Sequence, residues 1–189
     1  MALPESTTDP DTRAQELEAQ MTDDERFSLI ISVLGYVPGS VTGASGGRDP
    51  RIPADLTNMS AGYTPGIAQL GIPALQSSDA SMGVTNPGYR PDDPGATAFP
   101  SVIALGASFN PDLVREGGAA IGREARSRGF NVQLAGGCNL ARDPRNGRNF
   151  EYFSDDPYLS AVLVAEQVNG IQGEGVVSTL KHFSLNCNE

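Results

Sequence analysis

The chain has 189 residues, of which 39% are hydrophobic and 19% are charged, an ordinary balance for a globular α/β domain with one sizeable core. Its formal net charge of −10 argues against nucleic acid or an anionic membrane surface as a partner. The two cysteines, Cys138 and Cys187, are too few for a disulfide framework and lack the spacing of metal ligands. They could pair with each other, but we expect two buried thiols.

The start of the chain has no visible targeting segment, because the polar residues after Met1 contain no apolar stretch of the kind found in a signal peptide. No run of residues approaches the apolar length that a membrane span needs. The localisation stays open, since an export signal could have been removed.

The first expected element is a helix over residues 11–34. Thr22 and Glu25 have the spacing of a capping box, in which the two side chains bind otherwise unpaired backbone amides. An apolar stripe then recurs at helical spacing and predicts a helix face turned toward the core. The stripe consists of Phe27, Ile30, Ile31 and Leu34.

A loop rich in glycine, proline and serine is expected from residue 35 to residue 66. Its run from Gly43 to Gly47 invites comparison with a phosphate-binding loop, but the Lys-Ser/Thr ending of that motif is missing. Residues 71–79 predict a short strand that ends in the carboxylate of Asp79. Taken alone, Asp79 is as well explained by an exposed turn as by a site. A second loop rich in proline and glycine follows at residues 85–100.

Helices and strands alternate in the rest of the chain. Asn110 and Pro111 begin a helix that ends before Gly129, and Asp156 and Pro157 begin another over residues 157–172. Strands are expected at 130–135 and 175–182. This alternation predicts parallel βαβ units.

The loop from residue 139 to residue 157 concentrates charged side chains directly after the strand at 130–135. It contains Arg142, Arg145, Arg148 and Glu151, together with the turn dipeptides Asp143-Pro144 and Asn146-Gly147. Loops at the carboxyl ends of strands are where α/β folds build their sites. A solvated surface turn with paired charges is the simpler alternative for this loop alone.

The strand at 175–182 ends in Lys181 and His182, the only lysine and the only histidine of the chain. A single histidine at a strand end is often a hydrogen-bonded core residue, so the pair alone does not identify a site.

Three of these segments resemble motifs of glycoside hydrolase family 3, the family of β-glucosidases and their relatives. The longest match is the run from Arg142 to Pro157, and the others are Ser78 to Gly83 and Lys181 to Glu189. The resemblance implies an α/β fold of the (β/α)8 TIM-barrel type, incomplete in this chain, which would hold the first few βα units. It also implies two parts, a helical lead-in at 1–34 and a partial barrel at 35–189.

The resemblance assigns binding of the terminal sugar to Asp79, Arg148, Lys181 and His182, which lie at three separate strand ends. Arg142, Asp143 and Glu151 are expected to support the loop rather than to bind the sugar. The implied reaction is retaining hydrolysis of a β-glucoside, which releases a terminal non-reducing β-D-glucose and uses two carboxyl groups. No cofactor and no metal are implied, and the partner would be a β-glucoside or a short gluco-oligosaccharide.

Neither the family's nucleophile nor its acid/base has a match in this chain. We therefore expect the chain to be the amino-terminal part of a larger enzyme, which needs the remainder of the barrel and a following domain and is inactive alone. The alternatives are a sugar-binding module without chemistry, a β-xylosidase, or another specificity of the family. The β-N-acetylglucosaminidase branch is disfavoured, because residues 184–189 lack that branch's loop with its acid/base histidine.

Overall fold

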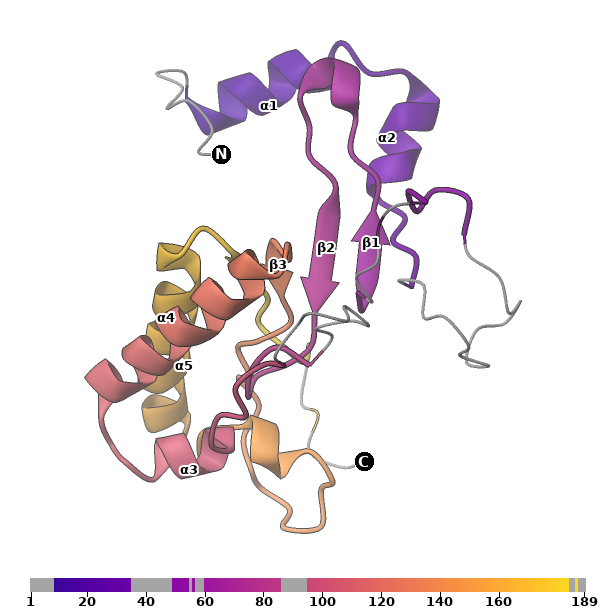
Figure 1. Ribbon diagram of the computed structural model, residues 1–189. Helices are drawn as coiled ribbons and strands as arrows, with labels where there is room; N and C mark the ends of the chain where they lie inside the picture. Colours follow the sequence, from indigo (N-terminus) through magenta and orange to yellow (C-terminus); the bar gives the residue numbers. More distant parts are fainter. Residues whose placement is uncertain are drawn as a thin grey trace.

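The computed structural model describes residues 9–34, 49–54, 56, 60–85, 95–183 and 186. The glycine run at 43–47 therefore lies outside the described residues, as does most of the loop at 85–100. Figure 1 shows two long helices, α4 and α5, beside a small sheet, with the first two helices near the tip of a β-hairpin.

The sheet has the strand order β1-β2-β3-β4. Its strands are β1 (Gly62–Thr64), β2 (Leu75–Ser78), β3 (Val132–Gln133) and β4 (Val177–Ser178). The hairpin pair β1 and β2 is antiparallel, whereas β2, β3 and β4 are parallel. The predicted parallel βαβ units are confirmed. Strand β1 was not predicted, because only three residues in a glycine-rich stretch form it.

The helices between the parallel strands begin where their capping residues predicted. In α4 (Pro111–Ser127), the Asn110 side chain accepts from the amide of Leu113 at 3.1 Å. In α5 (Pro157–Gly173), the Asp156 side chain accepts from the amide of Leu159 at 2.7 Å. A short helix, α3 (Val102–Gly106), precedes α4. Local capping interactions therefore determine where both long helices begin.

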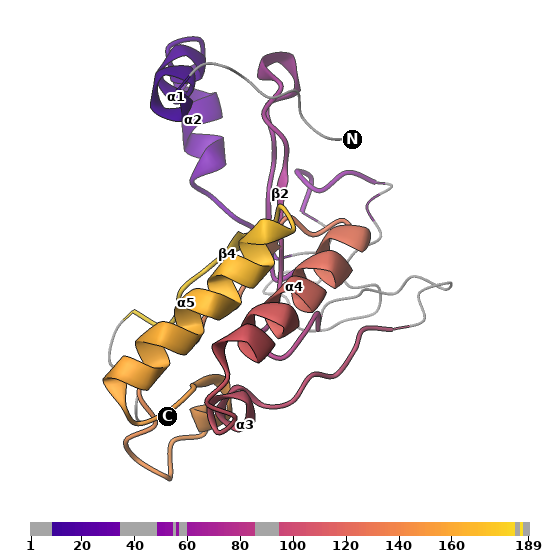
Figure 2. The same ribbon diagram turned by 90° about the vertical axis from the view of Figure 1, so that its left-hand side faces the viewer.

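Helices α4 and α5 lie side by side against the sheet (Figures 1 and 2). Their backbones approach closely at two glycines. A Cβ at Gly118 would lie 2.5 Å from the carbonyl oxygen of Gln167, and a Cβ at Gly170 would lie 2.2 Å from that of Arg115. Only glycine allows this approach. The core beneath includes Phe130, Ile171 and Val176, and a second cluster around Phe153 and Leu163 joins α5 to the loop before it.

The first helical region differs from its prediction in two respects. It forms two helices, α1 (Pro10–Glu18) and α2 (Asp23–Leu29), because the capping box of Thr22 and Glu25 starts a new helix. The predicted core-facing stripe is also wrong. Helix α2 ends at Leu29, before most of the stripe, and the stripe side chains are exposed. The exposed fractions are 59% for Phe27, 78% for Ile30, 48% for Ile31 and 69% for Leu34.

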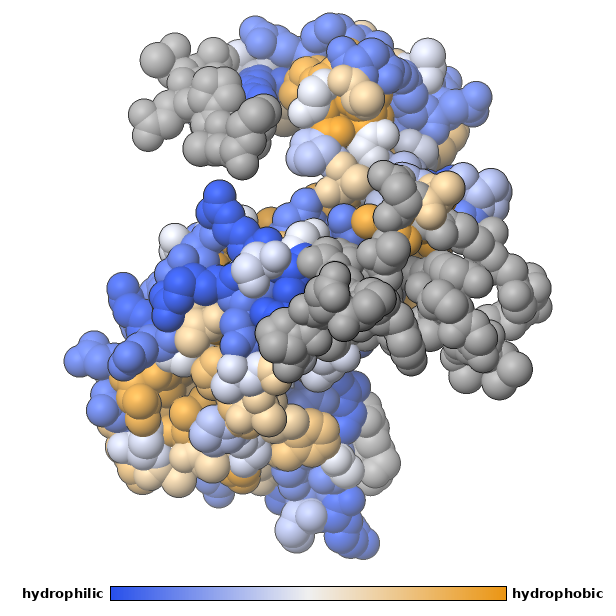
Figure 3. Space-filling model, viewed as in Figure 1, coloured by the Kyte–Doolittle hydropathy of each residue, from blue (hydrophilic) through white to orange (hydrophobic). Residues whose placement is uncertain are grey.

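These two helices lie near the tip of the β1–β2 hairpin in Figure 1. Val33 pairs with Tyr63 of β1, and the side chain of Gln69 near the hairpin tip donates to Glu25 of α2. Figure 3 shows apolar surface over α3 and the start of α4, where Ile103, Phe109 and Leu113 are exposed. No helix in the described ranges is both long and apolar enough to span a membrane.

Candidate functional site

The candidate residues lie at the carboxyl ends of three parallel strands. Asp79 directly follows β2, and the loop that contains Arg148 follows β3. Beyond β4, Lys181 pairs with Gly137 in a parallel bridge, and its amide donates to the carbonyl of Gly136 at 3.0 Å. The pairing of β3 with β4 thus extends to Lys181, so the three segments end at one edge of the sheet.

Glu151 is the centre of a buried ionic cluster at this edge. It ends the short helix η2 (Asn149–Glu151), and it is 4% exposed. Its Oε1 accepts from Nε of Arg148 at 2.6 Å and lies 2.6 Å from Nη2 of the same side chain. Its Oε2 lies 2.6 Å from Nζ of Lys181. One carboxylate therefore holds together two cations that are 33 positions apart in the sequence.

The ionisation of Glu151 results from two opposing effects. Burial raises the pKa of its carboxyl, but the hydrogen bonds from Arg148 and Lys181 and their positive charges outweigh burial, so the pKa lies below its usual value. The carboxylate is therefore ionised at neutral pH and neutralises one of the two cations. In this position Glu151 contacts both Arg148 and Lys181, and its role as a support of the loop stays a prediction.

His182 is held at both its ring and its backbone. Its Nδ1 lies 2.9 Å from the hydroxyl oxygen of Tyr152, which also accepts from Nδ2 of Asn186 at 3.1 Å. Its backbone amide donates to Oδ1 of Asn139 at 2.6 Å. Tyr152 and Asn139 are buried. The sequence alone points to neither residue, because no local pattern shows that residues 139 and 152 meet residue 182.

The loop after Asp79 is fixed by buried amide side chains from two other elements. Nε2 of Gln133, in β3, donates to the carbonyl of Ala80 at 2.7 Å, and Nε2 of Gln167, in α5, donates to that of Ser81 at 3.2 Å. Asp79 itself is half-buried, and its carbonyl accepts from the amide of Thr85 at 2.7 Å. The peptide bonds Asp79–Ala80 and Lys181–His182 are both cis.

The first half of the long loop is an exposed turn. Asp143 accepts from the Arg145 guanidinium at 3.0 and 2.8 Å, and these hydrogen bonds lower the pKa of the Asp143 carboxyl. The carbonyl of Asp143 also accepts from Nδ2 of Asn149 at 2.7 Å, which ties the turn to η2. Arg142 is exposed. The contacts of Asp143 thus support the loop, but they do not bring its carboxylate into the Glu151 cluster.

The cysteine prediction is wrong for Cys138, which is an exposed free thiol. The backbone amide of Cys138 donates to the carbonyl of Lys181 at 2.8 Å, so its position is fixed by strand pairing, not by burial of its side chain. Cys187 lies outside the described residues. Among the residues with described positions, no group of three or more His, Cys, Asp and Glu side chains could hold a metal ion.

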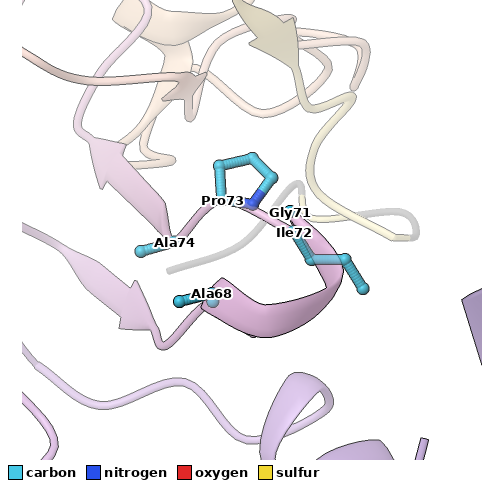
Figure 4. Close-up of a pocket in the computed structure, with 6 residues that line it drawn as sticks. Ala68, Gly71, Ile72, Pro73 and Ala74 are labelled. Atoms are coloured by element: carbon cyan, nitrogen blue, oxygen red, sulfur yellow. The ribbon is translucent and has the colours of Figure 1, made fainter. Parts of the chain in front are cut away.

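A separate shallow pocket of about 420 Å³ lies at the tip of the hairpin (Figure 4). It is lined by Gly66, Ala68, Gly71, Ile72, Pro73 and Ala74. These residues precede β2, whereas Asp79 follows it, so the pocket lies at the opposite end of this strand from the candidate site.

The chain matches the model of a known protein family over most of its length. Residues 39–186 match the family model described as the N terminal domain of glycosyl hydrolase family 3. The match includes Asp79, the long charged loop and the Lys181-His182 pair. The chain belongs to this family, and its fold is that of the family's TIM-barrel domain, of which it contains the first βα units.

Curated relatives of the chain are β-glucosidases. It is 44% identical over 133 residues to β-glucosidase BoGH3A of Bacteroides ovatus, an alignment that covers 67% of this chain and 18% of the relative. It is 40% identical over 126 residues to a β-glucosidase of Rhizobium radiobacter, with 67% of this chain and 15% of the relative covered.

Solved structures that are similar to the chain are also β-glucosidases. β-Glucosidase 3B of Thermotoga neapolitana in complex with α-D-glucose matches with a TM-score of 0.76 and 33% identity, over 90% of this chain and 23% of that one. DesR, a β-glucosidase of Streptomyces venezuelae in complex with D-glucose, matches with a TM-score of 0.74 and 34% identity, over 93% and 19% respectively. The chain thus spans less than a quarter of each of these relatives and solved structures.

Proposed function

We propose that this chain forms the site that grips the terminal sugar in a retaining β-glucosidase of family 3. Asp79, Arg148, Lys181 and His182 would bind the hydroxyl groups of a non-reducing β-D-glucose residue. The observation that carries the proposal is the cluster in which Glu151 holds Arg148 and Lys181 side by side at the strand ends. The bound glucose in the related β-glucosidase structures supports the choice of sugar.

The charges at this edge favour a neutral ligand that is rich in hydroxyl groups. Arg148 and Lys181 contribute two cations, and Glu151 and Asp79 contribute two carboxylates, so the set is balanced. A sugar phosphate would leave such a set with excess negative charge. A hydroxyl group both donates and accepts, so it can bind a carboxylate and a cation together.

In the proposed reaction, these residues orient the sugar and do not attack it. Retaining hydrolysis needs a carboxylate nucleophile and a carboxylic acid that protonates the leaving oxygen. We assign neither role to a residue of this chain, and we propose that both come from a longer polypeptide that includes residues 1–189. Hydrogen bonds to the sugar strengthen as positive charge develops at its anomeric carbon. The site would therefore contribute to the rate as well as to affinity.

The test is steady-state hydrolysis of an aryl β-D-glucoside by that longer polypeptide. Arg148→Ala and Lys181→Ala should each lower kcat/KM by about 10- to 100-fold, since a hydrogen bond to a charged group contributes about 1.5–3 kcal/mol. The matched control is Arg145→Ala, because Arg145 lies in the same loop with its side chain 87% exposed. Wild-type kcat/KM in both test variants would remove these residues from the site. Residues 1–189 alone should give no turnover.

A further inference from the structure

Two adjacent residues of the long loop contact two adjacent residues after β4. Glu151 binds Lys181, and the next residue, Tyr152, binds His182. Tyr152 is fully buried, at 0% exposed, and its ring meets that of His182 edge to face, with 6.1 Å between the ring centroids. The contact of Glu151 positions the charged amine of Lys181. The contact of Tyr152 involves one of the two ring nitrogens of His182, which differ in function.

We propose that Tyr152 fixes the tautomer of His182, so that Nδ1 is an acceptor and Nε2 carries the hydrogen. A neutral imidazole has one donor nitrogen and one acceptor nitrogen, and the partner of one nitrogen decides the role of the other. This proposal rests on the proposed function, because it makes Nε2–H the donor that His182 offers to a sugar hydroxyl. Tyr152 is thus a positioning residue, which acts through His182.

The contacts of the Tyr152 hydroxyl fit donation toward His182. A phenol has one hydrogen to donate and two lone pairs to accept with. Nδ2 of Asn186 donates to the Tyr152 oxygen at 3.1 Å, so this oxygen already accepts one hydrogen, and the phenolic hydrogen can be directed at His182. Nδ1 of His182 lies 2.9 Å from the same oxygen and can accept it. In the proposed order, Asn186 donates to Tyr152 and Tyr152 donates to His182, and consecutive hydrogen bonds of this kind strengthen one another.

The hydrogen bond at the backbone of His182 helps to hold its side chain in a fixed position. Because Oδ1 of Asn139 accepts from the His182 amide at 2.6 Å, the residue is fixed at its main chain as well as at Nδ1. The contact at Nδ1 also limits rotation of the ring, because a ring turned by half a turn would lose this contact. A fixed donor at Nε2 complements Asp79, whose carboxylate accepts. The two together would recognise hydroxyl groups that donate to one side chain and accept from the other.

The tautomer of His182 can be measured directly, and His182 is the only histidine in these 189 residues. The longer polypeptide that includes residues 1–189 is labelled with ¹⁵N-histidine, and a two-bond ¹H–¹⁵N correlation spectrum is recorded above neutral pH without sugar. The signals of His182 are assigned by their loss in a His182→Gln variant. An acceptor nitrogen and an N–H nitrogen have widely separated shifts, so the spectrum reports the tautomer. We expect one unaveraged form with hydrogen on Nε2. Tyr152→Phe should give averaged shifts, whereas Tyr158→Phe, which removes a hydroxyl from a side chain that is 79% exposed, should not.

Two results would overturn the proposal. One is hydrogen on Nδ1 in the wild-type chain, which would reverse the direction of donation. The other is an averaged pair of shifts in the wild-type chain equal to that of Tyr152→Phe. Titration of the same samples with D-glucose is a separate readout. We expect Tyr152→Phe to bind about tenfold more weakly than Tyr158→Phe. Equal binding by the two variants would refute the positioning role, and no binding by the wild type would count against the proposed function alone.

Discussion

Two ion pairs within the same loop have the same chemistry and opposite surroundings. Asp143 and Arg145 pair in the exposed turn, where their side chains are 27% and 87% exposed. Glu151 and Arg148 pair a few residues later, with side chains 5% and 31% exposed, and Lys181 joins them. Exposed pairs contribute little to stability because water competes for both partners. A buried carboxylate cannot lose its partners at so small a cost.

The difference comes from the apolar residues next to each pair. Tyr152 and Phe153 directly follow Glu151, and both are fully buried, with Phe153 in the core cluster that includes Val102 and Leu163. Their burial carries Glu151 into the interior. Gly137 leaves room for this segment, because a Cβ there would lie 1.9 Å from the carbonyl oxygen of Glu151. Asp143 has no such neighbours, since Pro144 and Arg145 are exposed. Burial by the flanking residues thus determines which pair becomes structural.

Removing the charge of each acid tests whether burial distinguishes the two ion pairs. Glu151→Gln leaves Arg148 and Lys181 near each other with no carboxylate between them. We therefore expect the free energy of unfolding to fall by about 3 kcal/mol. This is the low end of the usual cost of removing one partner of a buried ion pair, because Arg148 is partly exposed. Asp143→Asn should leave the unfolding midpoint unchanged. Urea unfolding followed by circular dichroism measures both variants. Equal midpoints for the two would show that burial does not distinguish the two pairs.

A steric change tests the same site without altering any charge. Gly137→Ala should destabilise the chain by about 1–3 kcal/mol, because both backbones at the contact must shift to admit a methyl group. Gly117→Ala is the matched control, since Gly117 lies within α4 with nothing within 4 Å of an added Cβ. There alanine should stabilise the chain by about 0.5–1 kcal/mol, because glycine is a poor helix residue. Opposite shifts of the thermal midpoint are expected, and a stabilising Gly137→Ala would contradict the close approach.

The sequence predicted those parts of the molecule that depend on neighbouring residues. The caps at Asn110 and Asp156 start their helices as expected, because a side chain that binds an amide three residues away is a local device. The alternation of strands and helices predicted the parallel strands, and strand ends predicted where Asp79 and Lys181 would lie. The motif resemblance, not composition or spacing, selected the site residues.

What the sequence could not predict depends on contacts between distant segments. The contact of Tyr152 with His182 joins residues 30 positions apart, and no periodicity reports it. The stripe that includes Phe27 and Ile30 has helical spacing, yet spacing does not say what covers a helix face, and both side chains are exposed. Cys138 is exposed for a similar reason, since its place is set by pairing with Lys181.

The smallest expected effect is a difference in how stability responds to acid. The pKa of Glu151 is lower in the folded chain than its usual value near 4.5, so below about pH 5 the unfolded chain binds more protons than the folded chain does. The stabilisation from this carboxylate is therefore complete above the unfolded pKa and is lost as the pH falls through the lower folded pKa.

Unfolding free energies of the wild type and Glu151→Gln, measured between about pH 3 and pH 6, should converge toward the acid end. The pKa of Asp143 is also lowered, by its hydrogen bonds from Arg145, but solvent screens that exposed pair, so the wild type and Asp143→Asn should run parallel over the same range. Convergence in the Asp143 series and not in the Glu151 series would assign the acid response to the exposed turn.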